Sequence, residues 1–117
     1  MNKYKEIFGV DISKGVFDVH GSKSGYNQFK NNPSGFKPFL KSLPKESLVV
    51  MEATGYYHFR LAQFLFKQGF LVSVVNPLSV KRFIQMKLAK VKTDKSDAKA
   101  ICEYGKINEV TLYTCIL

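Results

Sequence analysis

The stretch KEIFGVDI, residues 5–12, is an almost unbroken apolar run that ends beside an acidic residue, Asp11. Apolar residues that do not alternate with polar ones are typical of a strand buried on both faces of a sheet. A second such run, SLVVME at residues 47–52, ends on Glu52. A carboxylate at the end of a buried strand is costly unless a positive group compensates it. The two runs therefore predict a central sheet with acidic groups at the ends of two strands.

The other segments carry the periodicities of further strands and helices. Residues 16–21 alternate between polar and apolar positions, and residues 25–30 follow as the third strand of an antiparallel meander. Beyond them, helical spacing and Gly or Pro breaks mark the remaining elements. The expected strands are 5–12, 16–21, 25–30, 47–52 and 70–75, and the expected helices are 35–43, a helix between Gly55 and Gly69, one from about Leu78, and one from Thr93 or Asp94.

This element order predicts an α/β fold with a mixed five-stranded sheet flanked by helices. The order resembles that of the ribonuclease H-like fold, in which the first and fourth strands lie side by side. Asp11 and Glu52 would then end close together. Two local expectations concern the helices. Ser34 is expected to cap the first, and the inward stripe of the second is expected to be Tyr57, Leu61, Phe64 and Leu65.

The chain is strongly basic, which indicates a polyanionic partner. Its 117 residues, 45% of them hydrophobic, suffice for one domain with a real core. Lys and Arg number 18 against 9 acids, for a net charge of +9. Such an excess favours nucleic acid or an anionic membrane surface. The segment from Lys81 to Lys106 holds eight basic and three acidic residues. A solvated helical face explains many such runs, but here the run flanks two acids, which favours phosphate contact.

Other features of the sequence argue against a membrane protein. No apolar stretch approaches the length of a membrane span, and MNKYKEIFGVD at residues 1–11 lacks the apolar region of a signal peptide. Cys102 and Cys115 have no metal-ligand spacing. A reducing, bacterial cytoplasm is the simplest setting for the two thiols.

Four acidic residues are the candidates for chemistry. Two of them stand three apart in KTDKSDA, residues 92–98, a spacing that places both on one face of a helix. Carboxylate oxygens are ligands for Mg²⁺ or Mn²⁺, and a pair of such ions serves phosphoryl transfer. The candidate catalytic and metal-binding residues are therefore Asp11, Glu52, Asp94 and Asp97.

Each acid also has a structural interpretation. Asp94 and Asp97 suit the first turn of a helix, where acids interact favourably with the helix dipole. Asp11 suits a turn at a strand end, and Glu52 suits a helix cap near Thr54. The conjunction of all four is what favours a metal site.

Four fragments carry a family resemblance. GVDISKGVFDVH (9–20), VVMEATGYYH (49–58), GFLVSVVNPLSVKRF (69–83) and AKVKTDKSDAKAI (89–101) occur in the expected order and span most of the region from Ile7 to Tyr104. Together they resemble the N-terminal domain of the Piv/MooV-type insertion-sequence transposases. That family is called DEDD after its acidic tetrad and is related to the RuvC Holliday-junction resolvases.

The resemblance implies a RuvC-like, ribonuclease H-like fold with a divalent-metal site, whose tetrad falls on the four acids above. It also implies DNA strand cleavage and rejoining in transposition or site-specific inversion, by a homo-oligomer such as a dimer, with some relatives directed by a structured RNA. Lys and Arg side chains would contact the DNA backbone, and the candidates are Arg82, Lys90, Lys92 and Lys95.

Family members continue into a second domain with a serine nucleophile motif that this sequence does not contain. The resemblance thus assigns residues 1–106 to the catalytic domain, and residues 107–117 to the start of a connection. Two alternatives stay open. One is a DNA- or RNA-binding or dimerisation module that does not cleave. The other is an actin-like or sugar-kinase ATPase, for which DISKGVFD supplies only Gly15 where a glycine-rich phosphate turn is needed.

Several nearby residues have weaker claims to a role at the site. His58 suits a helix start better than proton transfer, and Asp18 suits an exposed strand position better than a fifth acid at the site. Tyr56 and Tyr57 are of a type that stacks on bases, but most aromatic residues in a chain this size pack a core.

Overall fold

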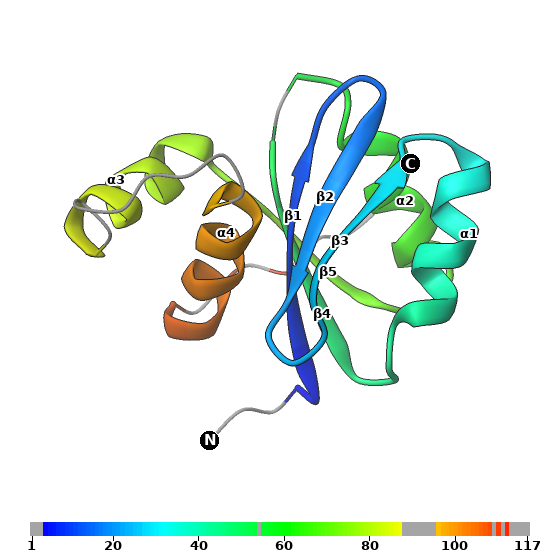
Figure 1. Cartoon of the computed structure of the whole chain (residues 1–117), viewed down its shortest axis with the longest axis horizontal. Coiled ribbons are helices and arrows are strands. Elements are labelled where there is room, and N and C mark those ends of the chain that lie inside the picture. The colour runs from blue at the N-terminus through cyan, green and yellow to red at the C-terminus, as the bar shows by residue number, and fades with distance from the viewer. Residues whose placement is uncertain (1–3, 54, 88–95, 109, 111, 113–117) are drawn as a thin grey trace.

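The computed structural model describes residues 4–53, 55–87, 96–108, 110 and 112, with the backbone alone for Lys87, Ser96 and Asp97. Figure 1 shows the elements. In chain order they are β1 (Glu6–Ile12), β2 (Val16–Gly21), β3 (Gly25–Lys30), α1 (Pro33–Ser42), β4 (Ser47–Glu52), α2 (Phe59–Lys67), β5 (Leu71–Val75), α3 (Pro77–Lys87) and α4 (Ser96–Ile107). The order predicted from the sequence is confirmed. The described part contains no helix with the length and apolar character needed to cross a bilayer.

The five strands form one mixed sheet in the order β3-β2-β1-β4-β5. The first three strands pair antiparallel, as tight turns between consecutive strands dictate. β4 then pairs parallel with β1, and β5 parallel with β4, because helices connect these strands. The predicted adjacency of the first and fourth strands is confirmed.

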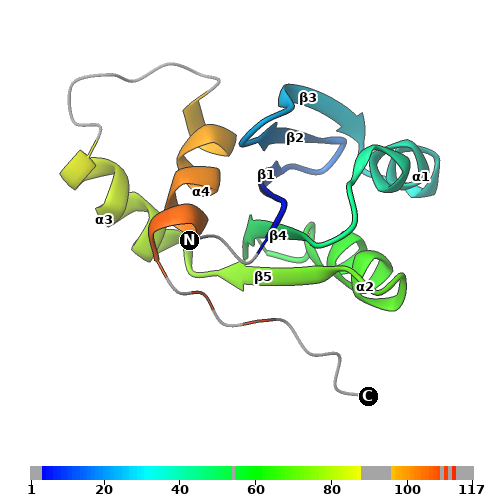
Figure 2. The same cartoon turned by 90° about the horizontal axis from the view of Figure 1, so that it is seen from below.

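Helices cover both faces of the sheet, with α1 and α2 on one face and α3 and α4 on the other (Figure 2). β1 contributes to both apolar clusters. Phe8 and Val10 belong to the cluster beneath α1 and α2, whereas Ile7 belongs to the cluster with α3 and α4. This two-sided burial explains the unbroken apolar run, and it means that alternate residues of β1 point toward opposite helical layers.

Two glycines let α4 lie directly on the sheet. A Cβ atom at Gly9 of β1 would collide with the backbone of Ala98 and Cys102 on α4, lying 2.8 Å from Cys102 Cα. A Cβ atom at Gly105 of α4 would lie 2.7 Å from Val50 Cγ2. Since Ala98 meets Gly9 while Gly105 meets Ile7 and Val50, α4 runs antiparallel to β1. The N-terminal end of α4 therefore lies toward the end of β1 that carries Asp11.

Some local expectations are wrong. Asn32, rather than Ser34, caps α1, because Asn32 is extended (φ −159°) just before Pro33, and its Oδ1 accepts from Gly35 N. Ser34 instead donates to Asn32 Oδ1 at 2.6 Å. Helix α2 begins at Phe59, so Tyr57 precedes it and is 46% exposed.

Other expectations about the helices are confirmed or fall outside the described part. The inward face of α2 is formed by Leu61, Ala62 and Leu65. Gly69 has φ +88° and ends that helix, as its position predicts. The expected start of the last helix, at Thr93 or Asp94, lies outside the described residues.

Candidate metal and nucleic-acid site

Asp11 and Glu52 lie at the same edge of the sheet and on the same face. β1 and β4 run parallel, and their last registered pair is Val10–Met51, one residue before each acid. Ile7 on β1 and Val50 on β4 pack with α4, so side-chain alternation directs Asp11 and Glu52 toward that face too. Both acids are half-buried, whereas Val10 and Met51 are fully buried. The strand ends thus bring two of the four predicted acids together.

The other two acids of the predicted tetrad are placed less fully. Asp97 is the second residue of α4 and adjoins Ala98, whose backbone lies against Gly9. The backbone at Asp97 is therefore near the edge where β1 ends. Asp94 lies outside the described residues, as does the side chain of Asp97.

The residues present fit a hard cation as far as the structure describes them. Two carboxylates on neighbouring strand ends, on one face, supply the oxygen ligands that Mg²⁺ and Mn²⁺ prefer. Within residues 4–53, 55–87 and 96–108, apart from the side chain of Asp97, no three His, Cys, Asp or Glu side chains form a metal-holding group. Asp94 and the side chain of Asp97, which the sequence predicts as further ligands, lie outside that search.

A further acid, Asp18, lies directly opposite Asp11 in the β1–β2 register, so it is on the same face. Its Oδ1 accepts hydrogen bonds from Tyr26 Oη at 3.0 Å and from Gln28 Nε2 at 2.7 Å. The hydrogen bond to Asp18 raises the pKa of Tyr26. Asp18 is half-buried rather than exposed as expected. The alternation in VFDVH, residues 16–20, indicates the face on which Asp18 lies, but the register that sets it opposite Asp11 comes only from the structure.

The loop that follows Glu52 and the first residue of α2 carry exposed aromatic side chains. Tyr56 is 90% exposed, Tyr57 46% and Phe59 49%. For Tyr56 and Tyr57 the interpretation that they pack the core is wrong, because residues 55–58 form turns between β4 and α2. Burial lowers the pKa of the neighbouring His58.

The predicted phosphate contacts are only partly described. Arg82 is exposed on α3, and Lys99 is exposed on α4. Lys90, Lys92 and Lys95 lie outside the described residues. His20 on β2 is half-buried, and its pKa is lowered first by burial and then by the nearby charge of Lys99.

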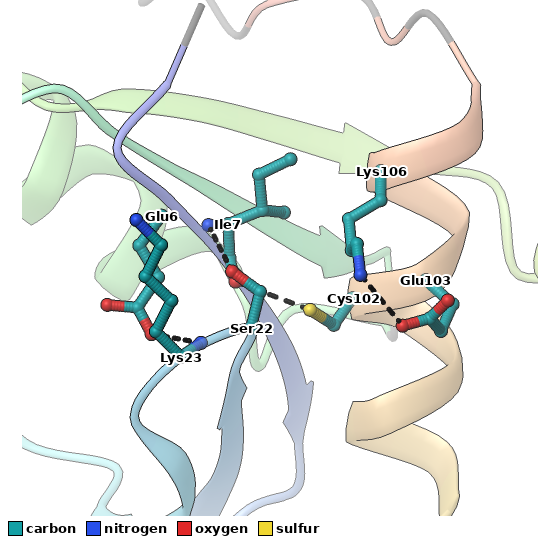
Figure 3. A network of polar contacts seen from close by, with 7 residues as sticks. All are labelled: Glu6, Ile7, Ser22, Lys23, Cys102, Glu103 and Lys106. Carbon is teal, nitrogen blue, oxygen red and sulfur yellow. Dashed lines mark hydrogen bonds and ion pairs between the residues drawn. The ribbon is translucent and has the colours of Figure 1, made fainter. Parts of the chain in front are cut away.

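The opposite end of α4 is held by structural contacts (Figure 3). Cys102 Sγ donates to Ile7 O at 3.3 Å, and burial raises the pKa of this thiol to about 11, so it stays protonated. Ser22 N donates to the same carbonyl at 2.9 Å. On the exposed side of the helix, Lys106 pairs with Glu103 at 3.4 Å. The hydrogen bond from Cys102 to Ile7 thus attaches α4 to β1.

A buried acid at the start of β1 also has a structural explanation. Glu6 is 5% exposed, and its Oε2 accepts from the backbone N–H groups of Lys23 and Ser24 at 2.8 and 2.6 Å. The hydroxyl of Ser24 donates to Oε1 at 3.0 Å. Glu6 thus binds the β2–β3 turn at the edge opposite Asp11.

A transposase family model, that of the DEDD transposases of the IS110 type, matches residues 8–114. The chain belongs to this family. The match spans both strand-end acids and both acids of residues 94–97. The family resemblance deduced from the four sequence fragments is thereby confirmed.

Two curated relatives of this IS110-type transposase chain are pilin gene-inverting proteins, from Moraxella bovis and Moraxella lacunata. Each is 31% identical over 111 residues, covering 86% of this chain and 34% of the relative. The chain therefore spans about a third of the length of these relatives.

Solved structures of RuvC share the fold of this transposase chain. Thermus thermophilus RuvC in complex with a Holliday junction substrate has a TM-score of 0.58 and 13% identity, covering 92% of this chain and 99% of RuvC. A second Thermus thermophilus RuvC structure has a TM-score of 0.55 at the same identity and coverage. The predicted ribonuclease H-like, RuvC-like fold is confirmed.

Proposed function

We propose that this chain is the metal-dependent, DNA-cleaving domain of an IS110-type transposase. The observation that carries the proposal is the meeting of Asp11 and Glu52 on one face at the ends of β1 and β4, in a chain of the DEDD family. The strand cleavage and joining would serve transposition or site-specific recombination, which is consistent with relatives named as gene-inverting proteins.

In this proposal Asp11, Glu52, Asp94 and Asp97 hold Mg²⁺ or Mn²⁺ as a two-metal site. When bound, such ions activate a water and stabilise the leaving oxygen of a phosphodiester. The chain supplies the rest. The carboxylates position the metal ions. Positive charges on Arg82, Lys90, Lys92 and Lys95 neutralise backbone phosphates without reading the DNA sequence. Asp18, held by Tyr26 and Gln28, adds negative charge beside Asp11 and so favours cation binding.

The remaining expectations belong to this proposal too. Residues 1–106 would be the catalytic domain, and residues 107–117 would lead toward a serine-containing domain. DNA would be the substrate, a guide RNA and a second copy of the chain would be partners, and the cytoplasm would be the location. The alternative is a module that binds DNA or RNA, or dimerises, without cutting, which the exposed Arg82 and Lys99 would equally support.

Calorimetric titration of Mn²⁺ tests the metal site. Asp11→Asn and Glu52→Gln should each abolish or greatly weaken the binding seen in the wild type, because each removes a negatively charged ligand. Glu46→Gln is the matched control, since Glu46 lies just before the other end of β4 and is exposed. Equal binding by the wild type, Asp11→Asn and Glu52→Gln would contradict the proposal.

A nicking assay on supercoiled or branched DNA separates the two functions. The proposal expects nicking that requires Mn²⁺ or Mg²⁺ and that Asp11→Asn abolishes. Salt-sensitive DNA binding by a protein that holds Mn²⁺ but never nicks would instead support the binding module.

A further inference from the structure

Asp11 and Glu52 are the first residues beyond the paired part of the β1–β4 register. That register ends at Val10–Met51. Beyond that pair β1 continues with β2, as Ile12 pairs with Phe17 and Ser13 N donates to Val16 O at 2.9 Å. β4 continues with β5, as Ala53 N donates to Val75 O at 3.0 Å. Each acid thus lies where β1 and β4 are paired with different neighbouring strands, an arrangement that we call the β1–β4 fork. The β1–β4 register alone does not fix the separation of the two acids.

A single side chain bridges the two arms of this fork. Asn31 Nδ2 donates to Ser13 O, in the turn after β1, at 2.9 Å. The same nitrogen donates to Tyr57 O, in the loop after β4, at 3.2 Å. The Asn side chain carries two amide hydrogens on one nitrogen, so it can serve both carbonyls at once. The two acceptors come two residues after Asp11 and five residues after Glu52.

The backbone around Asn31 is itself held in place. Asn31 N donates to Gly15 O at 2.9 Å, which attaches the backbone of Asn31 to the β1–β2 turn. The next residue, Asn32, caps α1. Asn31 is therefore held between β3 and α1, two elements that are themselves packed against the core, and its side chain has a fixed point from which to hold the two loops.

We propose that Asn31 is a positioning residue whose amide closes the β1–β4 fork and thereby sets the separation of the Asp11 and Glu52 carboxylates. The second half of this inference rests on the proposed metal site. Metal ions require ligand oxygens at defined separations, and Mg²⁺ in particular demands near-ideal geometry. Residues that hold metal ligands in place typically change metal affinity by 10- to 100-fold when they are replaced.

Asn31→Leu tests the bridge, because it keeps the approximate shape and the backbone N–H while removing both donated hydrogen bonds. Asn31→Ala is a second variant in case the leucine disturbs packing. Asn27→Leu and Asn27→Ala are matched controls on the adjoining edge strand β3, where the Asn27 side chain accepts from the neighbouring Gln28 N at 2.9 Å. Hydrogen–deuterium exchange measures the fork, and Mn²⁺ titration measures the site.

The expected result is faster deuterium uptake in residues 11–16 and 52–58 of the Asn31 variants, with unchanged uptake in residues 47–51. Mn²⁺ affinity should fall by about tenfold, with little effect in the Asn27 variants. A general loss of stability would instead raise the uptake in all of these regions.

Two results would overturn the inference. Unchanged uptake around the fork in both Asn31 variants would show that the bridge does not hold it. Faster uptake with unchanged Mn²⁺ affinity would show that the bridge does not position the carboxylates. If the wild type itself showed no Asp11-dependent Mn²⁺ binding, the proposed function would fail, and the uptake comparison would still decide whether Asn31 closes the fork.

Discussion

His58 stands at an unusual place, between the exposed aromatic loop and α2. It is the residue before the helix, yet its backbone is already helical (φ −81°, ψ −20°), and its side chain makes no capping hydrogen bond. Its Nδ1 atom is buried, with no hydrogen-bond partner in the part of the chain that the structure describes. A buried imidazole in this position resists protonation, because the charged form loses its hydration. His58 is thus better suited to a neutral structural role than to carrying a proton.

The two histidines predict how stability depends on pH. Burial lowers the pKa of both His20 and His58, so near pH 6 the unfolded chain binds more protons than the folded chain. The contribution of the two neutral histidines to the free energy of unfolding should therefore be fully present above the ordinary histidine pKa of about 6.5. It should decline as the pH falls below that value. Urea unfolding at a series of pH values measures this. The double variant His20→Asn, His58→Asn should show a flatter profile between pH 7.5 and 5.5; an unchanged slope would count against both assignments.

At the scale of single residues, the sequence located the acids better than their surroundings. Asp11 and Glu52 were recognisable because each interrupts a buried apolar run. Asp18 was harder to place, since strand alternation gives a face but not the partner across the sheet. Tyr57 was misplaced because it continues the helical spacing of Leu61 and Phe64, and periodicity does not show that turns precede α2. The Asn31 bridge joins three segments distant in sequence, which no local pattern reveals.

At the scale of elements, the packing of α4 on β1 decides where the second pair of acids goes. The contacts of α4 with the sheet involve Gly9 on β1 and Val50 on β4. Gly9 and Gly105 remove the side chains that would hold the two backbones apart. Ala98, Ile101 and Cys102 pack in the interface that remains, each at most 2% exposed. Tight packing of this kind fixes the helix start relative to Asp11.

Gly9→Ala should lower stability and weaken Mn²⁺ binding at the proposed metal site. The new methyl group would meet backbone atoms of Ala98 and Cys102, which cannot move aside without lifting α4. Overpacking of this kind typically costs about 1–3 kcal/mol, and lifting α4 should also carry Asp97 away from Asp11. Thermal unfolding and Mn²⁺ titration measure the two effects.

Gly15→Ala provides the matched control, since a Cβ atom there would meet nothing within 4 Å and Gly15 has no positive φ. That variant should keep both its melting temperature and its Mn²⁺ affinity. If Gly9→Ala behaved in the same way, α4 would not depend on the close approach.

Most elements were predictable because apolar runs, alternation and glycine or proline breaks act locally. The strand order followed from the resemblance to a known fold, since periodicity alone does not say which strands pair. The docking of α4 could not be predicted, because nothing local distinguishes a glycine that admits a helix from one that bends a strand. The β1–β4 fork is likewise a property of pairing partners and not of either strand.

At the scale of the whole molecule, the net charge of +9 does not say which surface would meet DNA in the proposed function. The two helical layers both carry exposed cations, but only one of them lies on the face of the two acids. α3 and α4, with exposed Arg82 and Lys99, cover the face toward which Asp11 and Glu52 point. α1 and α2 cover the other face, and α1 also carries an exposed cation, Lys37. In the proposed function, a DNA backbone that reaches the carboxylates would pass on the α3–α4 side.

Arg82→Gln should therefore weaken DNA binding, whereas Lys37→Gln should leave it nearly unchanged, although both remove one exposed positive charge. Each phosphate contact that is lost reduces the slope of log affinity against log salt concentration by about 0.9, because fewer counterions are released. Fluorescence anisotropy with a labelled duplex, measured across salt concentrations, gives the slope for the wild type and both variants. Equal slopes for the two variants would mean that the +9 charge acts as a diffuse field, and that the orientation of DNA on this domain has to come from the acidic edge instead.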